Sequence, residues 1–202
     1  MTETSSTSRD VILENVRRLL PSEKVEPPKI PAFTKRNGSL KSEFISLLER
    51  AAGKTYDIAS PSEAAIKLAM LHPNAKVACS AVPEIAGTRD VHKVSDPHDL
   101  GDVDVGIIRA QFGIAENGAV WLTEQDLGIT ALGFLSQHLI ILLDPEQIVA
   151  DMHEAYRRVK LNKTAFGTFM MGPSATGDIE ATLVHGAQGP RSLNVFFLAP
   201  GA

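Results

Sequence analysis

The fold is decided by the stretch Leu139-Ile140-Ile141-Leu142-Leu143, which is followed at once by Asp144-Pro145-Glu146-Gln147. Five consecutive apolar residues are typical of a strand that is buried on both faces of a parallel sheet. The next four residues place an N-cap oxygen, a proline at the first helical position and a capping-box side chain at a helix start. A buried strand followed by a helix start predicts a crossover unit of an α/β protein.

The same order of strand and helix recurs along the chain. Ser60-Pro61-Ser62-Glu63 repeats the helix-start chemistry, and Asp96-Pro97-His98-Asp99 is a shorter version that Gly101 ends. Helical patterns cover residues 8–20, 40–52, 62–71 and 146–161, and candidate strands cover residues 55–59, 76–79, 103–110, 119–123, 138–143, 165–170 and 193–198. This alternation predicts a three-layer α/β domain with a central, mainly parallel sheet covered by helices on both sides.

The beginning of the chain forms a separate part in this prediction. Residues 8–20 carry apolar side chains at helical spacing and stop at Pro21, whereas residues 21–38 are proline-containing and lack periodicity. We therefore expect an N-terminal helix and extended connector over residues 1–38 and one α/β domain over residues 39–202.

Composition excludes several function classes. The 202 residues are 44% hydrophobic and 22% charged, as in soluble globular proteins, and the net charge of -4 comes without the basic stripe of a nucleic-acid partner. No apolar stretch reaches the roughly 18–20 residues of a membrane helix, and residues 1–10 lack the pattern of a secretory signal. We expect a cytoplasmic protein that has neither nucleic-acid partners nor a membrane span.

The single cysteine limits redox chemistry. Cys79 ends the apolar run Val77-Ala78-Cys79, which predicts a buried structural thiol. An iron–sulfur cluster usually needs four thiolates, so this chain cannot supply the ligand set. The histidines show no metal-ligand spacing, and no metal site is expected.

The segment richest in chemistry is Gly172-Pro173-Ser174-Ala175-Thr176-Gly177-Asp178-Ile179-Glu180. The pattern of Ile179, Leu183 and Val184 predicts that this small-residue loop runs into a helix. A helix N-terminus offers unpaired N–H groups and a positive dipole end, so the loop suits a phosphate or carboxylate, with Ser174 and Thr176 as further donors. The structural alternative is an N-cap and tight loop in which Asp178 favours the helix dipole.

A second glycine-rich element, His185-Gly186-Ala187-Gln188-Gly189-Pro190-Arg191, follows within one short predicted helix. Arg191 could hold a carboxylate through two hydrogen bonds, although a surface arginine is the commoner case. The candidate ligand-binding residues, which would take an anionic small molecule, are Gly172, Ser174, Thr176, Asp178, Gln188, Gly189 and Arg191.

These two segments resemble the C-terminal signature of the lactate-utilization protein C family, the LUD-domain proteins. That signature is a Gly-Pro-Ser-x-Thr-x-Asp-Ile-Glu loop, then Gly-x-His-Gly-Pro and a strand, and it matches residues 172–190 followed by Leu193-Asn194-Val195. Residues 114–120 resemble the family's Ala-Glu-Thr-Gly-Thr segment. Gln188 stands where the family usually has histidine, which puts any proton transfer assigned to that histidine in doubt.

The resemblance implies a fold similar to the ribose-phosphate isomerase and CoA-transferase group. It also implies a role as a non-redox component or accessory of an iron–sulfur system that oxidizes L-lactate to pyruvate. In this hypothesis the chain binds no cofactor of its own, and iron–sulfur clusters belong to partner subunits, the iron–sulfur lactate-utilization proteins.

Glu116 supports an alternative hypothesis. Glu116-Asn117-Gly118 resembles the segment that carries the nucleophilic glutamate of class I CoA-transferases, so Glu116 is a candidate catalytic residue of a free-standing enzyme acting on an acyl-CoA or anionic small molecule. Asn-Gly is also a strong hairpin signal, which makes a structural turn the competing interpretation.

Overall fold

The computed structural model describes residues 7–20, 26, 28, 31, 38–160, 164–179 and 182–201. The chain separates into two compact units, Met1–Lys35 and Arg36–Ala202. In the first unit, helix α1 (Ser8–Leu19) begins with a capping box between Thr7 and Asp10 and buries none of its residues. Most of the expected connector lies outside the described residues, and the boundary after residue 38 stays a prediction.

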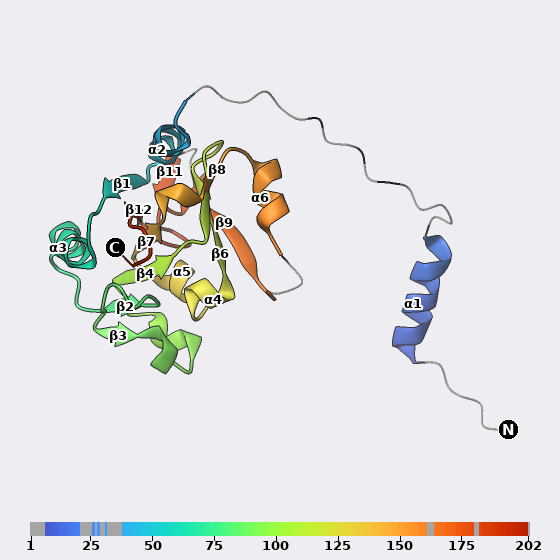
Figure 1. Ribbon diagram of the computed structural model, residues 1–202. Coiled ribbons are helices and arrows are strands. Elements are labelled where there is room, and N and C mark those ends of the chain that lie inside the picture. The colour runs from blue at the N-terminus through green and yellow to red at the C-terminus, as the bar shows by residue number, and fades with distance from the viewer. Residues whose placement is uncertain are drawn as a thin grey trace. The chain divides into compact units, whose positions relative to one another are not determined.

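The second unit is organised around a six-stranded sheet in the order β1-β12-β7-β4-β2-β3 (Figure 1). Every neighbouring pair in this sheet is parallel. Its strands are β1 (Lys54–Asp57), β2 (Ala78–Ser80), β3 (Arg89–Asp90), β4 (Val105–Arg109), β7 (His138–Leu143) and β12 (Ser192–Phe197). The predicted α/β fold with a mainly parallel central sheet is confirmed.

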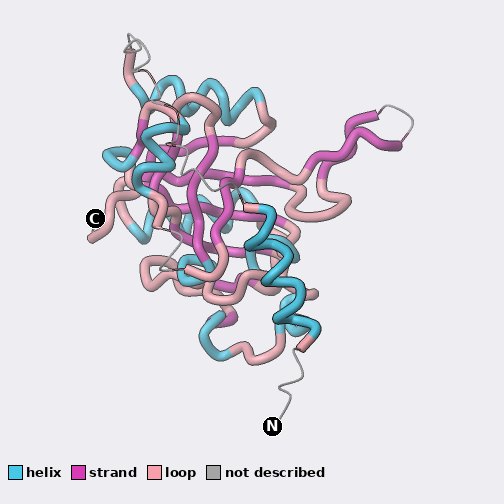
Figure 2. The backbone as a smooth tube through the Cα atoms, turned by 90° about the vertical axis from the view of Figure 1, so that its right-hand side faces the viewer, coloured by secondary structure: helices cyan, strands magenta, loops and turns pink. Residues whose placement is uncertain are grey.

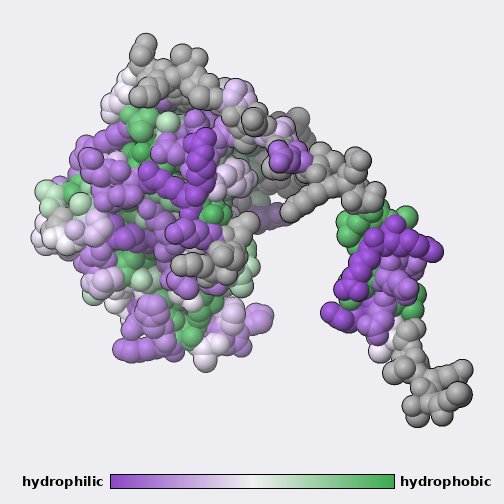
Figure 3. Space-filling view, turned by 45° about the vertical axis from the view of Figure 1, so that its right-hand side comes forward, coloured by the Kyte–Doolittle hydropathy of each residue, from purple (hydrophilic) through white to green (hydrophobic). Residues whose placement is uncertain are grey.

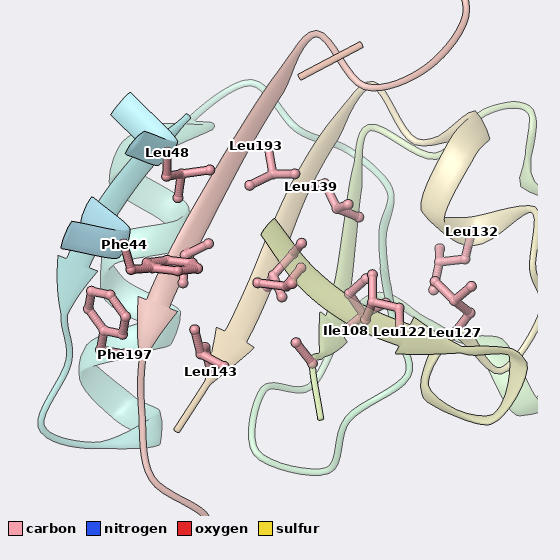
Figure 4. Close-up of a cluster of buried hydrophobic side chains, with 14 of the residues drawn as sticks. Phe44, Leu48, Ile108, Leu122, Leu127, Leu132, Leu139, Leu143, Leu193 and Phe197 are labelled. Atoms are coloured by element: carbon pink, nitrogen blue, oxygen red, sulfur yellow. The ribbon is translucent and has the colours of Figure 1, made fainter. Parts of the chain in front are cut away.

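Strand β7 shows why the sheet is covered on both faces. Leu139, Ile141 and Leu143 belong to one buried cluster, and Ile140 and Leu142 belong to another. Helix α2 (Leu40–Arg50) covers the first face through Phe44 and Leu48, as Figure 4 shows, and helix α3 (Pro61–Leu71) packs on the second. Burial of each side chain of this size contributes about 1.5–3 kcal/mol to the stability of the fold, so the continuous apolar run stabilises the packing on both faces of the sheet.

A second, four-stranded sheet lies over the α2 face, in the order β8-β5-β6-β9. Its strands are β5 (Phe112–Ile114), β6 (Ala119–Thr123), β8 (Ile148–Val149) and β9 (Gly167–Met170), and the short helices α4 (Glu124–Leu127) and α5 (Leu132–Leu135) follow β6. Trp121 is only 4% exposed and packs in the outer cluster with Ala155 of helix α6 (Met152–Arg158), so it is a core residue.

The helix predicted over residues 146–161 is wrong in its first half. Asp144-Pro145 starts only the 3-10 helix η3 (Pro145–Gln147), after which Ile148 and Val149 form β8 beside β5. These two β-branched residues are almost fully buried in the second sheet, and a helix at this place would lose the stabilisation that this burial provides. Helix α6 instead starts at its own N-cap, Asp151, and the predicted end at residue 161 lies outside the described residues. The shorter start at Asp96 gives η2 (Pro97–Leu100), as expected, and η1 (Val91–Lys93) precedes it.

The helix predicted after Gly172 is also wrong. Residues there form a separate hairpin of β10 (Ala175–Ile179) and β11 (Thr182–His185), which projects from the body in Figure 2. The strands pair Ala175 with His185 and Thr176 with Val184. β-branched side chains are frequent in both strands and favour extended backbone over helix. The positive helix end that motivated the anion-binding prediction is therefore not formed.

The surface outside the core is largely polar. Figure 3 shows hydrophilic and hydrophobic side chains together on α1, whose Ile12 and Leu19 are exposed. Within the described ranges, we find no helix with the length and apolar character that crossing a membrane requires.

Candidate functional site

The two glycine-rich segments meet at the base of the hairpin. The Ser174 amide donates to the Pro190 carbonyl at 2.9 Å, and the Gly186 amide donates to the Ser174 carbonyl at 2.8 Å. A Cβ atom on Gly189 would lie 3.0 Å from the Ser174 Cβ. The hairpin thus brings Ser174 and Gly189, two of the predicted ligand-binding residues, against each other.

Both family motifs rest on the last turns of α2. Gly172 has φ +63°, and a Cβ there would lie 2.2 Å from the Ala51 carbonyl oxygen. Gly118, in the β5–β6 turn, has φ +71°, and its Cβ would lie 2.4 Å from the Leu48 amide nitrogen. Since α2 ends where the chain enters β1, both motifs lie at the edge of the main sheet where its parallel strands begin. We call this edge the amino edge.

Glu116 has a structural task at the β5–β6 turn. Its carboxylate accepts a hydrogen bond from the amide of Met152, the first residue of α6, at 2.9 Å. The Asn117-Gly118 turn forms as predicted, with the Gly118 amide donating to the Ile114 carbonyl at 2.9 Å. Glu116 lines neither of the two pockets described below. Its covalent role stays a prediction that this geometry does not support.

The remaining predicted residues are spread along the hairpin. Thr176 and Asp178 lie in β10, and the side chain of Asp178 is outside the described part of the structure. Gln188 is exposed on the loop after β11. The Arg191 amide donates to the Gln137 carbonyl at 2.8 Å, directly before β12. The amides of residues 174, 186 and 191 are thus engaged by carbonyl groups rather than directed at an anion.

A pocket of about 430 Å³ opens at the amino edge. It is lined by residues that begin or directly precede parallel strands, together with the end of α3. Its polar side chains include Lys54, His72, Asp104, His138, Ser192 and Asn194. We call it the amino-edge pocket.

Two stacked histidines form the centre of the amino-edge pocket. The rings of His72 and His138 lie 4.3 Å apart at an angle of 26°. The Nδ1 atom of His138 is 2.8 Å from the Ser192 hydroxyl. The buried Nε2 atom of His72 has no hydrogen-bond partner among the described residues. In this pair, His138 has a hydrogen-bond partner in Ser192, whereas the Nε2 atom of His72 can still make a hydrogen bond.

Burial keeps both histidines uncharged at neutral pH. Burial, with repulsion from His138, lowers the pKa of His72 to about 4. Burial also lowers the pKa of His138, and so does the charge of Arg191, while Asp104 opposes the shift. Because the pKa of both rings falls, the stack is neutral at pH 7.

The fixed charges around the histidines are positive on balance. Lys54 lines the pocket, and the positive charge of Arg191 is near enough to lower the pKa of His138. Asp104 is the opposing carboxylate, and its Oδ2 atom accepts from the amides of Lys76 at 2.7 Å and Val77 at 2.9 Å. These bonds lower the pKa of Asp104. The pocket suits a ligand of negative charge.

A second pocket of about 470 Å³ lies at the opposite, carboxyl edge. After β2 the chain continues to β3 on one side in the sheet, and after β4 it continues to β7 on the other side. The crevice where the strand order reverses in this way is the usual ligand position in open α/β sheets. Arg109 pairs with Glu84 at 2.7 Å and donates to the Leu198 carbonyl at 2.9 Å. Asp126 and Asp144 also line this pocket, so carboxylates outnumber the guanidinium and disfavour an anion.

Sequence reasoning missed the paired histidines because nothing in their spacing links them. His72 follows α3 and His138 begins β7, and only the crossover connections of the fold bring them together. Within the described ranges, His, Cys, Asp and Glu form no group of three that could hold a metal ion.

Comparisons with known proteins identify what this chain resembles. A model of the LUD domain matches residues 42–198. An uncharacterized protein of Neisseria meningitidis serogroup B is 31% identical over 102 residues, 49% of this chain and 44% of that protein. Lactate utilization protein C of Shouchella clausii is 32% identical over 93 residues, 43% of this chain and 40% of that protein. The chain thus spans less than half the length of these two relatives in the matched region.

Two matches extend over most of the chain. Lactate utilization protein C of Deinococcus radiodurans is 26% identical over 181 residues, 86% of this chain and 85% of that protein. The crystal structure of a DUF162 family protein from Deinococcus radiodurans has a TM-score of 0.59 and 18% identity, covering 78% of this chain and 94% of that one. The structural match supports the fold. The likeness to the ribose-phosphate isomerase and CoA-transferase group stays a prediction.

Proposed function

This chain belongs to the LUD domain family, and from that premise we propose that it takes part in lactate utilization. The observation that carries the proposal is the family match, which spans residues 42–198 and so includes the whole main sheet and the hairpin. Two relatives bear the name lactate utilization protein C. The gathering of both family motifs on the end of α2 supports a shared function at the amino edge.

In the finer form of the proposal, the chain is a cytoplasmic, non-redox component or accessory of an iron–sulfur system that oxidizes L-lactate to pyruvate. That oxidation removes two electrons, which a cofactor must accept. Cys79, the single cysteine, is fully buried in β2, and burial raises the pKa of its thiol. Partner iron–sulfur proteins would therefore carry the electrons, while this chain binds the organic acid or organises the assembly.

Gene deletion tests the proposal. A strain that lacks this gene, and has no paralogue, should grow poorly on L-lactate as sole carbon source and normally on glucose, and a plasmid copy should restore growth. Normal growth and lactate oxidation in the deletion strain would show that the proposal is wrong. Purification of the full chain from lactate-grown cells should also recover iron–sulfur proteins in stoichiometric amounts, and recovery of the chain alone would argue against the finer form.

A further inference from the structure

We propose that the amino-edge pocket binds a small organic monocarboxylate and that the stacked pair of His72 and His138 takes up one proton as the ligand binds. The choice of a 2-hydroxy or 2-oxo acid within this class rests on the proposed function. The pocket, the ring stack and the surrounding charges are independent of it.

The shape and place of the amino-edge pocket suit a small molecule. Its volume of about 430 Å³ is within the range of roughly 300–1,000 Å³ that small-molecule sites occupy. It lies where β1, β7 and β12 begin, so rigid strands hold its lining. This volume lies toward the lower end of that range, which favours a small acid over a large ligand such as a nucleotide.

The charges around the amino-edge pocket favour an anionic ligand. Lys54 and Arg191 are opposed by Asp104 alone among the charged groups identified around the stack, and two backbone amides already stabilise the Asp104 carboxylate. The positive charge of Lys76 also lowers the pKa of Asp104. An incoming carboxylate therefore enters a field of positive sign, whereas at the carboxyl edge it would meet Glu84, Asp126 and Asp144.

The histidine stack can take up a proton when an anion binds. A carboxylate beside the stack stabilises an imidazolium, because an opposite charge nearby favours the charged form. Two imidazolium rings at a centroid distance of 4.3 Å would repel each other, so the pair takes one proton rather than two.

Two further polar side chains of the pocket can bind a second oxygen of the ligand. The Ser192 hydroxyl already bonds His138, and the Asn194 side chain is 3% exposed at the pocket wall. Both side chains can donate to, or accept from, a second oxygen. A 2-hydroxy or 2-oxo acid offers such an oxygen beside its carboxylate, and acetate does not.

Proton uptake has a measurable consequence. Between the pKa of the free pair and that of the bound pair, the affinity for the acid should fall about tenfold for each unit rise in pH, since one proton enters with each ligand. Calorimetric titration of the full chain with L-lactate and with pyruvate, from about pH 5.5 to 7.5 in buffers of different ionisation enthalpy, measures both affinity and proton uptake. L-lactamide, which is uncharged, should show no such pH dependence, and inorganic phosphate should bind less tightly than lactate.

Variants test which residues are responsible. Replacing both histidines, His72→Phe with His138→Phe, keeps aromatic rings at the stack and should abolish proton uptake and weaken lactate binding at least about tenfold. Lys54→Gln changes an exposed side chain and should weaken binding several-fold while leaving proton uptake at one, so it serves if the double variant does not fold.

Three results would overturn the inference: no binding of either acid at any pH, binding without pH dependence or proton uptake, or a folded double variant that binds as well as the natural chain. Tighter binding of phosphate would show that the ligand class is wrong. Each of these failures is distinct from failure of the proposed function, since the deletion strain would still lose growth on lactate if the chain acted only through its partners.

Discussion

Replacing Gly172 by alanine should destabilise the domain because this glycine makes the contact that seats the family loop on α2. At φ +63° an alanine costs about 1–2 kcal/mol in backbone strain. Its Cβ would also lie 2.2 Å from the Ala51 carbonyl oxygen, and relieving that overlap costs about 1–3 kcal/mol more. The sum is a loss of about 2–5 kcal/mol in the free energy of unfolding, or a fall in Tm of roughly 4–20 °C.

Gly177 is the matched control within the same motif. A Cβ there meets nothing within 4 Å, and its φ lies outside the left-handed region. Both substitutions reduce the entropy of the unfolded chain equally, by about 0.4–1 kcal/mol, so their difference isolates the native-state effect. Urea denaturation of Gly172→Ala and Gly177→Ala measures it. Equal stability of the two variants would refute the role assigned to the close approach at Ala51.

Other predictions concern single side chains. His72→Phe should flatten the loss of stability as pH falls from about 6.5 toward 4, because the pKa of His72 is lowered in the folded protein and the unfolded state takes up the proton first. Thermal unfolding from about pH 7.5 to 4.5 measures the dependence of stability on pH, and an unchanged slope would contradict this prediction. Glu116→Gln should keep growth on lactate, with a stability loss of about 1 kcal/mol or less, because an amide oxygen can still accept from Met152; loss of growth in a folded variant would support the nucleophile instead. Leu139→Ala should cost about 2–5 kcal/mol by urea denaturation, and a much smaller cost would mean that this face of β7 is not packed as described.

The sequence predicts the elements whose local pattern agrees with their packing. Residues 138–143 and 119–123 are strands with the expected bounds, and the helix start at Ser60-Pro61 forms as expected. In these places the local preference and the burial favour the same conformation, so short-range reasoning succeeds.

Prediction fails where the fold overrides a local signal. The capping chemistry at Asp144 is genuine but ends after one turn, because Ile148 and Val149 gain more by joining the second sheet. Most of the loop predicted after Gly172 is itself strand β10, since apolar residues four apart in a short segment fit a hairpin as well as a helix.

The candidate site follows the same division. The sequence identifies the glycine-rich segments, and the structure joins Ser174 to Gly189. The stack of His72 on His138 depends on where α3 ends relative to the beginning of β7, a relation that no local pattern encodes. A pocket between strand ends is therefore beyond prediction from spacing alone.

Growth of the deletion strain on L-lactate, with a plasmid copy altered at one edge or the other, tests whether the amino edge serves lactate utilization. The amino-edge copy carries His72→Phe with His138→Phe, and the control carries Gln125→Ala, an exposed residue that lines the carboxyl-edge pocket. With both proteins folded and equally abundant, we expect the double variant to fail to restore growth and Gln125→Ala to restore it fully. Full growth with the double variant would show that lactate utilization does not depend on the amino edge, whatever the result with Gln125→Ala.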